Sequence, residues 1–283
     1  MFSIKVKEEW IWEEISLKQG KSLYSSLHNN NSYILLLATL NMTKISAGSY
    51  DLNKFLYGGY EEDIITTIYG DAGAGKTNFC ILAAVSQTKK ESKVIFMDTE
   101  GGFSAERFKQ IAGEEYKRYL ENVILLKPVN FEEQIKNFNI LLKELKNNHS
   151  IKLIIVDGMT MLYRLEITEA RSKKDDAKIR DINGELARQM RALAEIARTK
   201  NIAVIVTNQG YHEFIQEEEW RQGKRGETKM VGGDIMKYWS KCIIELKNEK
   251  NKRKMILRKH RSLGEKDMDF EIVNSGIRKR GWL

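Results

Sequence analysis

Proline, cysteine and histidine are scarce in this sequence of 283 residues, which has one proline, two cysteines and four histidines. Two cysteines, Cys80 and Cys242, are too few for a disulfide framework or a four-cysteine zinc site. The longest strongly apolar run, residues 33–40, is far shorter than the roughly 20 residues that a membrane helix needs. It follows several glutamates, a pattern that a secretory leader does not have. We therefore predict an intracellular, soluble, cytoplasmic protein without a structural metal cage.

Apolar residues make up 42% of the sequence and charged residues 30%. This composition excludes extensive disorder, because it supplies enough apolar surface for a buried core. The length suits one large domain, or a domain with an appendage.

Charge is distributed unevenly around a net value of +8. Residues 221–283 hold 18 Lys and Arg against 8 Asp and Glu, whereas the first 220 residues hold 29 against 31. A basic C-terminal part on a slightly acidic body is typical of a face that binds a polyanion. A solvated, lysine-rich surface gives the same counts, so composition leaves both interpretations open.

Short apolar, β-branched runs alternate with segments of helical periodicity, the pattern of parallel α/β folds. The predicted strands cover residues 64–69, 93–98, 123–127, 153–157 and 202–208. The predicted helices cover residues 76–89, 104–112, 131–146 and about 177–200. Three more strand-like runs follow without intervening helices, at residues 240–247, 253–260 and 268–273. We therefore predict an α/β fold, a mostly parallel sheet flanked by helices, with C-terminal antiparallel strands.

Residues 1–44 show neither clean helical nor clean strand periodicity. They have three interpretations: a small accessory segment that packs on the core, an arm that docks a partner, or a misassigned start. The regular pattern begins just after Met42, which favours Met42 as the start. The expected organisation is an N-terminal extension over residues 1–44 and one domain over residues 45–283.

The clearest motif is a glycine-rich turn between the strand at 64–69 and the helix at 76–89. It reads Gly70-Asp71-Ala72-Gly73-Ala74-Gly75-Lys76-Thr77 and matches G-x-x-x-x-G-K-[ST]. In such a turn, backbone N–H groups converge on phosphate oxygens, and the helix N-terminus adds its dipole. We expect Lys76 to bridge the β- and γ-phosphates of ATP and the Thr77 hydroxyl to bind Mg²⁺. The strand-turn-helix context distinguishes this motif from an ordinary glycine-rich turn.

Polar groups end three of the predicted strands. Asp157 ends the strand at 153–157 and is a candidate metal ligand, although a strand-end carboxylate also commonly caps a turn. Glu100 lies two residues beyond Asp98 and could polarise the attacking water, or it could be a surface-turn glutamate. Gly158 follows Asp157, so a catalytic base is not expected there. Gln209 follows the strand at 202–208, where an amide could sense a γ-phosphate.

These elements, in this order, resemble the RecA/RadA recombinase family. Beyond the turn at 70–77, the resemblance is carried by Ile45-Ser46-Ala47-Gly48-Ser49 through Leu52, Gly58-Gly59, Asp98-Thr99-Glu100-Gly101-Gly102-Phe103, Glu106-Arg107-Phe108, Leu186-Ala187-Arg188-Gln189-Met190, Val206-Thr207-Asn208-Gln209 and Gly232-Gly233-Asp234-Ile235. It runs from about Ile45 to the C-terminus and implies a RecA-like P-loop ATPase core. It also implies that Glu100 activates water and that Arg107 packs on adenine.

By the same resemblance, residues 166–181 and 210–231 would be two DNA-facing loops. The first offers Arg171, Lys173 and Lys174, and the second offers Arg221, Lys224, Arg225 and Lys229. Mobile basic loops suit the phosphate backbone of single-stranded or branched DNA. However, the second loop also holds four glutamates, and a solvated connection is the plainer interpretation of each loop. Trp220 either stacks on a base or anchors local packing.

Three features depart from the full recombinases of the family. No helix-hairpin-helix domain precedes Ile45, no convincing F-x-x-A element lies upstream of the core, and Tyr238 stands where those proteins have a histidine. These departures imply an accessory paralogue with weak ATP hydrolysis that assists the main recombinase and other repair proteins without strand exchange of its own. Residues 259–261 could contact a neighbour's nucleotide, or they could be the exposed end of a basic strand.

We therefore expect an ATP- and DNA-binding protein of recombination and repair. Two alternatives stay open. One is a DNA-binding mediator that uses ATP only as a structural ligand. The other is a RecA-fold switch ATPase that acts on protein partners and has little affinity for DNA.

Overall fold

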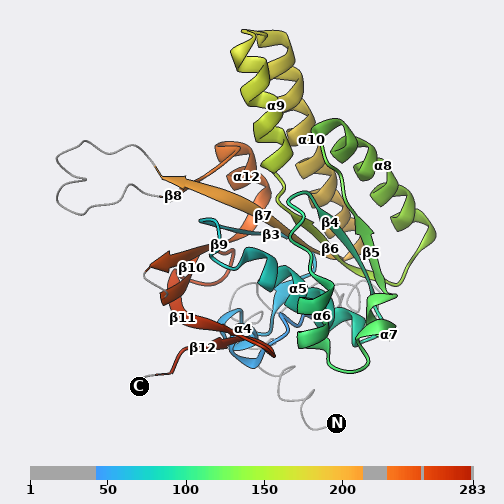
Figure 1. Ribbon diagram of the computed structural model, residues 1–283, viewed down its shortest axis with the longest axis vertical. Coiled ribbons are helices and arrows are strands. Elements are labelled where there is room, and N and C mark those ends of the chain that lie inside the picture. The colour runs from blue at the N-terminus through green and yellow to red at the C-terminus, as the bar shows by residue number, and fades with distance from the viewer. Residues whose placement is uncertain (1–42, 213–227, 250–251, 282–283) are drawn as a thin grey trace, which may run out of the picture. The chain divides into compact units, whose positions relative to one another are not determined.

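The computed structural model describes residues 43–212, 228–249 and 252–281 (Figure 1). Within these residues a ten-stranded sheet runs in the order β12-β11-β10-β9-β3-β7-β6-β4-β5, with β8 paired to β7. The predicted extension at residues 1–44 lies almost wholly outside the described part, so its three interpretations stay predictions. Among the described residues, no helix combines the length and the apolar character needed to cross a membrane.

The five predicted parallel strands are neighbours in this sheet and reach its edge at β5. They are β3 (Ile65–Gly70), β4 (Lys93–Asp98), β5 (Val123–Leu126), β6 (Ile151–Asp157) and β7 (Ala203–His212). All pairs among them are parallel, so their carboxyl ends meet at one edge. Their near-continuous apolar runs follow from burial on both faces, because helices cover the two sides. The predicted strand bounds are confirmed to within a few residues at each end.

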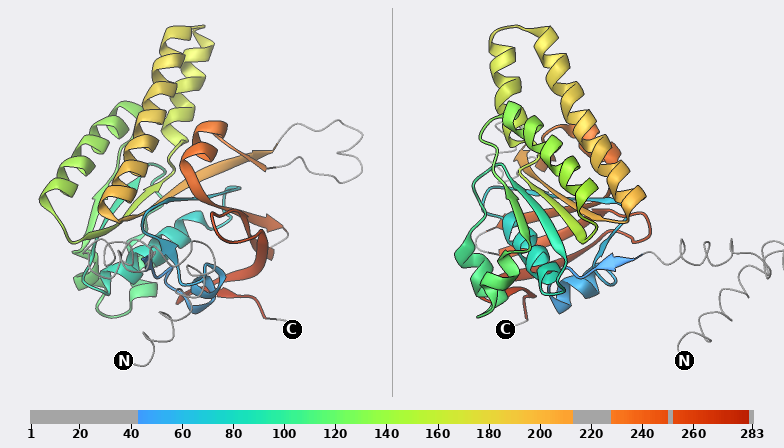
Figure 2. Two further views of the ribbon diagram at one scale, coloured as in Figure 1. Left: turned by 180° about the vertical axis from the view of Figure 1, so that it is seen from behind. Right: turned by 90° about the vertical axis from the view of Figure 1, so that its right-hand side faces the viewer.

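Helices cover both faces of the sheet and enclose two apolar cores. One face carries α5 (Lys76–Thr88), α6 (Ala105–Ala112) and α7 (Tyr116–Leu120). The other carries α8 (Phe131–Asn147), α9 (Met161–Ser172), α10 (Asp176–Lys200) and α12 (Gly233–Trp239). Helices α9 and α10 form a hairpin whose tip extends beyond the sheet in all views (Figures 1 and 2).

The C-terminal strands add an antiparallel extension, as predicted. Strand β9 (Ser240–Glu249) pairs in parallel with β3, and β10 (Lys252–Lys259), β11 (Lys266–Val273) and β12 (Gly276–Lys279) follow in antiparallel order. Strand β12 was not expected from the sequence, because its four residues give no recognisable alternation.

Ion pairs neutralise much of the basic charge on this extension. On the face away from the core, Lys254 pairs with Asp267 and Arg258 with Glu245. Arg278 pairs with Glu271 in the same way. Acidic groups therefore lie among the basic ones on this face, and the basic residues of these strands remain in excess.

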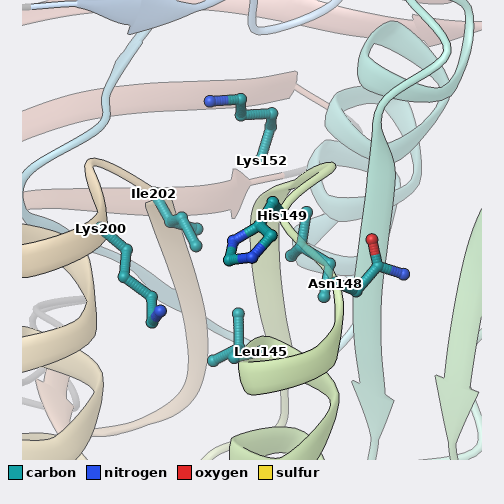
Figure 3. A pocket seen from close by; sticks show the side chains of 7 residues that line it. Leu145, Asn148, His149, Lys152, Lys200 and Ile202 are labelled. Carbon is teal, nitrogen blue, oxygen red and sulfur yellow. The ribbon is translucent and has the colours of Figure 1, made fainter.

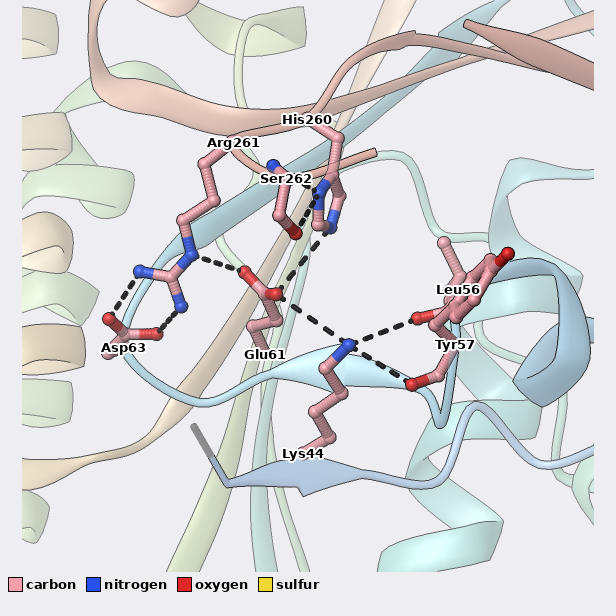
Figure 4. A network of polar contacts seen from close by, with 8 residues as sticks. All are labelled: Lys44, Leu56, Tyr57, Glu61, Asp63, His260, Arg261 and Ser262. Carbon is pink, nitrogen blue, oxygen red and sulfur yellow. Dashed lines mark hydrogen bonds and ion pairs between the residues drawn. The ribbon is translucent and has the colours of Figure 1, made fainter. Parts of the chain in front are cut away.

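A small second sheet joins the start of the described chain to the end of β10. It consists of β1 (Lys44–Ile45) and β2 (Tyr60–Glu61), connected through α4 (Tyr50–Phe55). The buried Glu61 carboxylate lies 2.7 Å from Arg261 Nε and 3.7 Å from both Lys44 Nζ and His260 Nε2 (Figure 4). Arg261 also pairs with Asp63. These side chains are engaged within the chain, and the contact of residues 259–261 with a neighbour's nucleotide stays a prediction.

The expectation of a first loop was wrong, and that of a second was wrong at its ends. Residues 166–181, expected as a mobile loop, are helical except for residues 173–175, because α9 and α10 continue to the tip of their hairpin. The buried Ile167 and Ala170 of α9 and Ile182 of α10 lie at helical spacing and hold these helices in the core.

The second expected loop, residues 210–231, is replaced at both ends by strands, since β7 continues to His212 and pairs with β8 (Thr228–Met230). Its middle, residues 213–227, lies outside the described residues and stays a prediction.

Candidate nucleotide site and the segments beside it

The glycine-rich turn lies at the carboxyl end of β3 and leads directly into α5. Gly75 precedes the helix with φ 111°, in the left-handed region, and no side chain caps the first turn. The first N–H groups of α5 are therefore available to an anion. A Cβ at Gly75 would lie 2.9 Å from Ile272 Cδ1 of β11, so only glycine lets the turn pack this closely on the C-terminal strands.

Lys76 folds back over the turn that precedes it. Its ammonium donates to the carbonyl oxygens of Gly70 at 2.9 Å and Asp71 at 3.0 Å. Burial lowers the pKa of Lys76, while the nearby carboxylates of Glu100 and Asp157 oppose that shift. The charge of Lys76 thus lies between the turn at 70–75 and the strand-end carboxylates, where an inserted phosphate would meet it.

Thr77 and Asp157 face the same small space next to α5. Asp157 is buried, and its Oδ1 accepts a 2.6 Å hydrogen bond from Thr207. A Cβ at Gly102 would lie 3.1 Å from Thr77 Oγ1 and 3.7 Å from Asp157 Oδ2, so the bare Cα of Gly102 borders this space. Burial raises the pKa of Asp157, and hydrogen bonds from the hydroxyls of Thr207 and Thr77 act against that shift. A hydroxyl and a buried carboxylate suit Mg²⁺, which retains waters and phosphate oxygens as its other ligands.

The two carboxylates at the end of β4 have different surroundings. Asp98 is buried and accepts hydrogen bonds of 3.0 Å from the N–H groups of Gly102 and Phe103, so it shapes the turn after β4. Asp98 is therefore occupied within this turn, and the water-activating role of Glu100 stays a prediction. Glu100 is accessible to solvent, yet desolvation of its carboxyl group and the charge of Asp157 raise its pKa.

Arg107, in the first turn of α6, is held by all five of its side-chain N–H groups. It donates to Asn78 of α5, to Gln110, and to the carbonyl oxygens of the β11–β12 turn, Val273 at 2.8 Å, Asn274 at 3.3 Å and Gly276 at 3.3 Å. These bonds fix the guanidinium between α5, α6 and the β11–β12 turn. The predicted packing of Arg107 on adenine stays a prediction.

Gln209 lies beside the glycine-rich turn, where the register of β3 and β7 pairs it with Gly70. The neighbouring Asn208 donates to Val231 O at 2.7 Å and accepts from Val231 N at 3.2 Å. These bonds hold both ends of the segment 210–231 next to the glycine-rich turn at residues 70–77. Thr207 and Asn208 also lie at this edge, but the sequence analysis gave a role only to Gln209. Their position at the end of the same strand, directly before Gln209, could have indicated them.

The basic residues predicted to contact DNA are only partly described. Lys229 lies on β8, whereas Arg221, Lys224 and Arg225 lie outside the described residues, as does Trp220. Arg171, Lys173 and Lys174 lie together at the hairpin tip, far along the chain from the phosphate turn.

Carboxylates accompany the basic groups of the hairpin tip. Lys173 pairs with Glu169 at 2.5 Å, and Lys178 pairs with Glu166 at 2.6 Å. The tip therefore presents mixed charge, which weakens the expected attraction to a phosphate backbone.

A separate cavity of about 180 Å³ opens at the opposite, amino edge of the sheet (Figure 3). Leu145, Ile151 and Ile202 form its apolar walls, and Lys152 and Lys200 lie at its rim. Strands β6 and β7 begin at this edge, so the length of the sheet separates the cavity from the predicted phosphate site.

Comparison with known proteins agrees with this arrangement. The sequence model of the family described as Rad51 matches residues 39–280. The chain is 39% identical over 230 residues to the DNA repair and recombination protein RadB of Methanobrevibacter smithii, covering 80% of this chain and 92% of that protein. It is 41% identical over 226 residues to the protein of the same name from Methanocaldococcus jannaschii, covering 80% and 98%. With a family match over most of its length and relatives of this similarity, the chain belongs to the Rad51 family, in its RadB branch.

Proposed function

We propose that this chain binds Mg·ATP at residues 70–77, hydrolyses it slowly, and uses the bound state to control its affinity for DNA during recombination and repair. The observation that carries the proposal is the placement of the Thr77 hydroxyl and the buried Asp157 carboxylate around one space beside an uncapped helix N-terminus. A carboxylate at this depth is costly to ionise unless hydrogen bonds and a cation compensate its charge, and Mg²⁺ would supply that cation. The names of the relatives, DNA repair and recombination protein, support the biological setting.

Each residue of the site has a role that its position supports. The N–H groups of the turn and of α5 would bind phosphate oxygens, and Lys76, which now donates to the carbonyls of Gly70 and Asp71, would donate to the β- and γ-phosphates. Thr77 and Asp157 would hold Mg²⁺, and the ion would neutralise negative charge on the phosphates. Glu100 orients and deprotonates the attacking water, for which its raised pKa makes it a stronger base.

The link to DNA runs through the segment that follows Gln209. Gln209 pairs with Gly70, and the Asn208 side chain hydrogen-bonds to the backbone of Val231. A hydrogen bond from Gln209 to a γ-phosphate would therefore move both ends of the segment 210–231. ATP then orders this segment for DNA, and hydrolysis resets it. We place the main DNA contact there, with the hairpin tip as a weaker contact, and we expect single-stranded or branched DNA, the main recombinase and other repair proteins as partners.

The test is DNA binding with and without Mg·ATP, measured by fluorescence anisotropy with labelled single-stranded DNA over a series of salt concentrations. We expect ATP to raise the affinity, and the affinity to fall steeply with salt, with a slope that counts the neutralised phosphates. ATP binding without any DNA affinity contradicts the DNA part of the proposal. Binding of DNA that is equal with and without ATP contradicts the switch.

The second candidate function, a switch ATPase that acts on protein partners, is favoured by one observation. The ion pairs of Lys173 and Lys178 leave the projecting hairpin nearly balanced in charge, which suits a protein surface better than a phosphate backbone. The DNA titration separates the two functions, since this candidate predicts no measurable binding to DNA at moderate salt.

A further inference from the structure

Segments distant in the sequence meet at a buried carboxylate, that of Glu61 in β2, whose side chain is 1% exposed (Figure 4). Arg261 Nε lies 2.7 Å from this carboxylate, and Lys44 Nζ of β1 lies 3.7 Å from it. Lys44 also donates to the carbonyl oxygens of Leu56 and Tyr57. Two cations therefore already compensate the charge of Glu61, at a depth where an unpaired carboxylate would be costly.

His260 also faces Glu61, and its ring is held in one protonation state. Its side chain is 3% exposed, and its Nε2 lies 3.7 Å from Glu61 Oε1. Its Nδ1 accepts a 3.1 Å hydrogen bond from the backbone N–H group of Ser262. A nitrogen that accepts a hydrogen bond carries no proton, so this contact requires a neutral imidazole with its proton on Nε2.

Protonation of His260 would add a third cation to this cluster. The charged groups of the cluster come from both sides of the contact, and they are Lys44, Glu61 and Asp63 on the N-terminal side and Arg261 and Lys266 on the C-terminal side. Burial lowers the pKa of His260. The charge of Glu61 opposes this shift, whereas the three cations add to it. A proton on Nδ1 would also meet the Ser262 N–H group, so the arrangement fits only a neutral ring.

We infer that His260, through Glu61 and Ser262, forms an acid-sensitive latch that holds the sheet β1–β2 against the β10–β11 turn while its imidazole is neutral and releases it when the imidazole is protonated. Residues 261 and 262 of this turn are exposed, so a charged ring reaches water by rotation of its side chain. The inference involves no residue of the proposed ATP site, and it stands or fails independently of the proposed function.

The sign of the pH dependence follows from the lowered pKa of His260. In the unfolded chain a histidine takes up its proton near about pH 6.5, whereas His260 in the fold takes it up only at lower pH. The contribution of the latch to stability is therefore complete above about pH 6.5 and is lost as the pH falls below that value.

The test compares His260→Asn with the wild type and with His149→Asn in the full-length protein. The Asn amide oxygen can accept from Ser262 N–H in place of Nδ1 but cannot be protonated at neutral or mildly acidic pH. His149 is exposed and serves as the control. Between about pH 7.5 and about pH 5.5, we expect the wild type and His149→Asn to lose about 2–4 °C more in Tm than His260→Asn. Equal losses in the wild type and His260→Asn overturn the inference.

Hydrogen exchange locates the effect. At about pH 5.5, peptides that cover residues 44–63 and 257–266 should exchange faster in the wild type than in His260→Asn, and at about pH 7.5 they should exchange equally. Because the two proteins are compared at one pH, the chemical effect of pH on exchange cancels. Equal exchange at both pH values overturns the inference.

Should His260→Asn not fold, an NMR titration of the assigned histidine rings in the wild type decides alone. We expect the His260 ring to carry its proton on Nε2 at neutral pH and to titrate below about pH 6.5. A proton on Nδ1, or titration at or above about pH 6.5, overturns the inference.

Discussion

Charged residues suggest function at two described places, which are built in opposite ways. One is the sheet edge beside the glycine-rich turn at residues 70–77, and the other is the tip of the α9–α10 hairpin. At the edge, the buried Asp157 and Thr207 are joined by a hydrogen bond across strands, and the buried Asp98 accepts hydrogen bonds from the turn that follows β4. At the tip, Glu169 and Lys173 are exposed and pair only along one helix. The edge can hold atoms in fixed positions for chemistry, whereas the tip can offer only diffuse charge.

This difference predicts how each place responds to substitution. A change at the edge disturbs several buried groups at once, because each polar atom there has few alternative partners. A change at the tip is absorbed by water and by side-chain rearrangement. Variants at both places therefore test the comparison directly.

The largest effect is expected for Lys76→Ala, which removes the cation between the turn and the strand-end carboxylates. Charge-assisted hydrogen bonds contribute about 1.5–3 kcal/mol each, so loss of two to the phosphates lowers ATP affinity by about 100-fold or more. Isothermal titration calorimetry with Mg·ATP measures this. Lys136→Ala, which removes an exposed lysine of α8 paired with Glu132, is the control and should leave ATP affinity unchanged. Equal affinity in Lys76→Ala and wild type would remove the phosphate site from residues 70–77.

A smaller but still large effect is expected for Arg107→Ala, at the margin of the same site. It removes the guanidinium that joins α5 and α6 to the β11–β12 turn through Asn78 and Val273. We expect a loss of about 2–3 kcal/mol in stability, because several carbonyl and amide groups lose their donor. For a domain of this size that corresponds to about 5–10 °C in Tm by calorimetry or circular dichroism.

The control for Arg107 is Arg118→Ala on the short helix α7. Arg118 is exposed and pairs with Glu91 at 2.7 Å, a contact of the kind that contributes about 0–1 kcal/mol. If Arg107→Ala and Arg118→Ala have the same Tm, the hydrogen bonds of Arg107 to the β11–β12 turn do not contribute to the stability of the fold.

The sequence predicted the edge better than the tip for a physical reason. The phosphate turn needs glycines and a lysine at fixed spacing, and buried parallel strands need apolar runs, so both leave a pattern in the chain. The bonds from Thr207 to Asp157 and from Thr99 to Gly158 join strands distant in sequence, and no local pattern encodes them. At the tip, the loop at 166–181 was expected from the family resemblance alone, and the charges there did not contradict it, because mixed charges look alike in a solvated loop and in an exposed helix.

The smallest effect is expected for the tip itself. Because Glu169 already compensates Lys173, Lys173→Ala should change stability by less than about 0.5 kcal/mol and DNA affinity by less than about twofold. Glu169→Ala releases the lysine and should raise DNA affinity if the tip approaches DNA, while Glu132→Ala, which breaks the equivalent pair on α8, should not.

The salt dependence of DNA binding decides between the roles of the hairpin. The slope to measure is that of the logarithm of the DNA-binding constant against the logarithm of salt concentration. If this slope is smaller in magnitude by about 0.9 in Lys173→Ala, Lys173 neutralises one phosphate, and the DNA lies at the tip rather than at the segment 210–231.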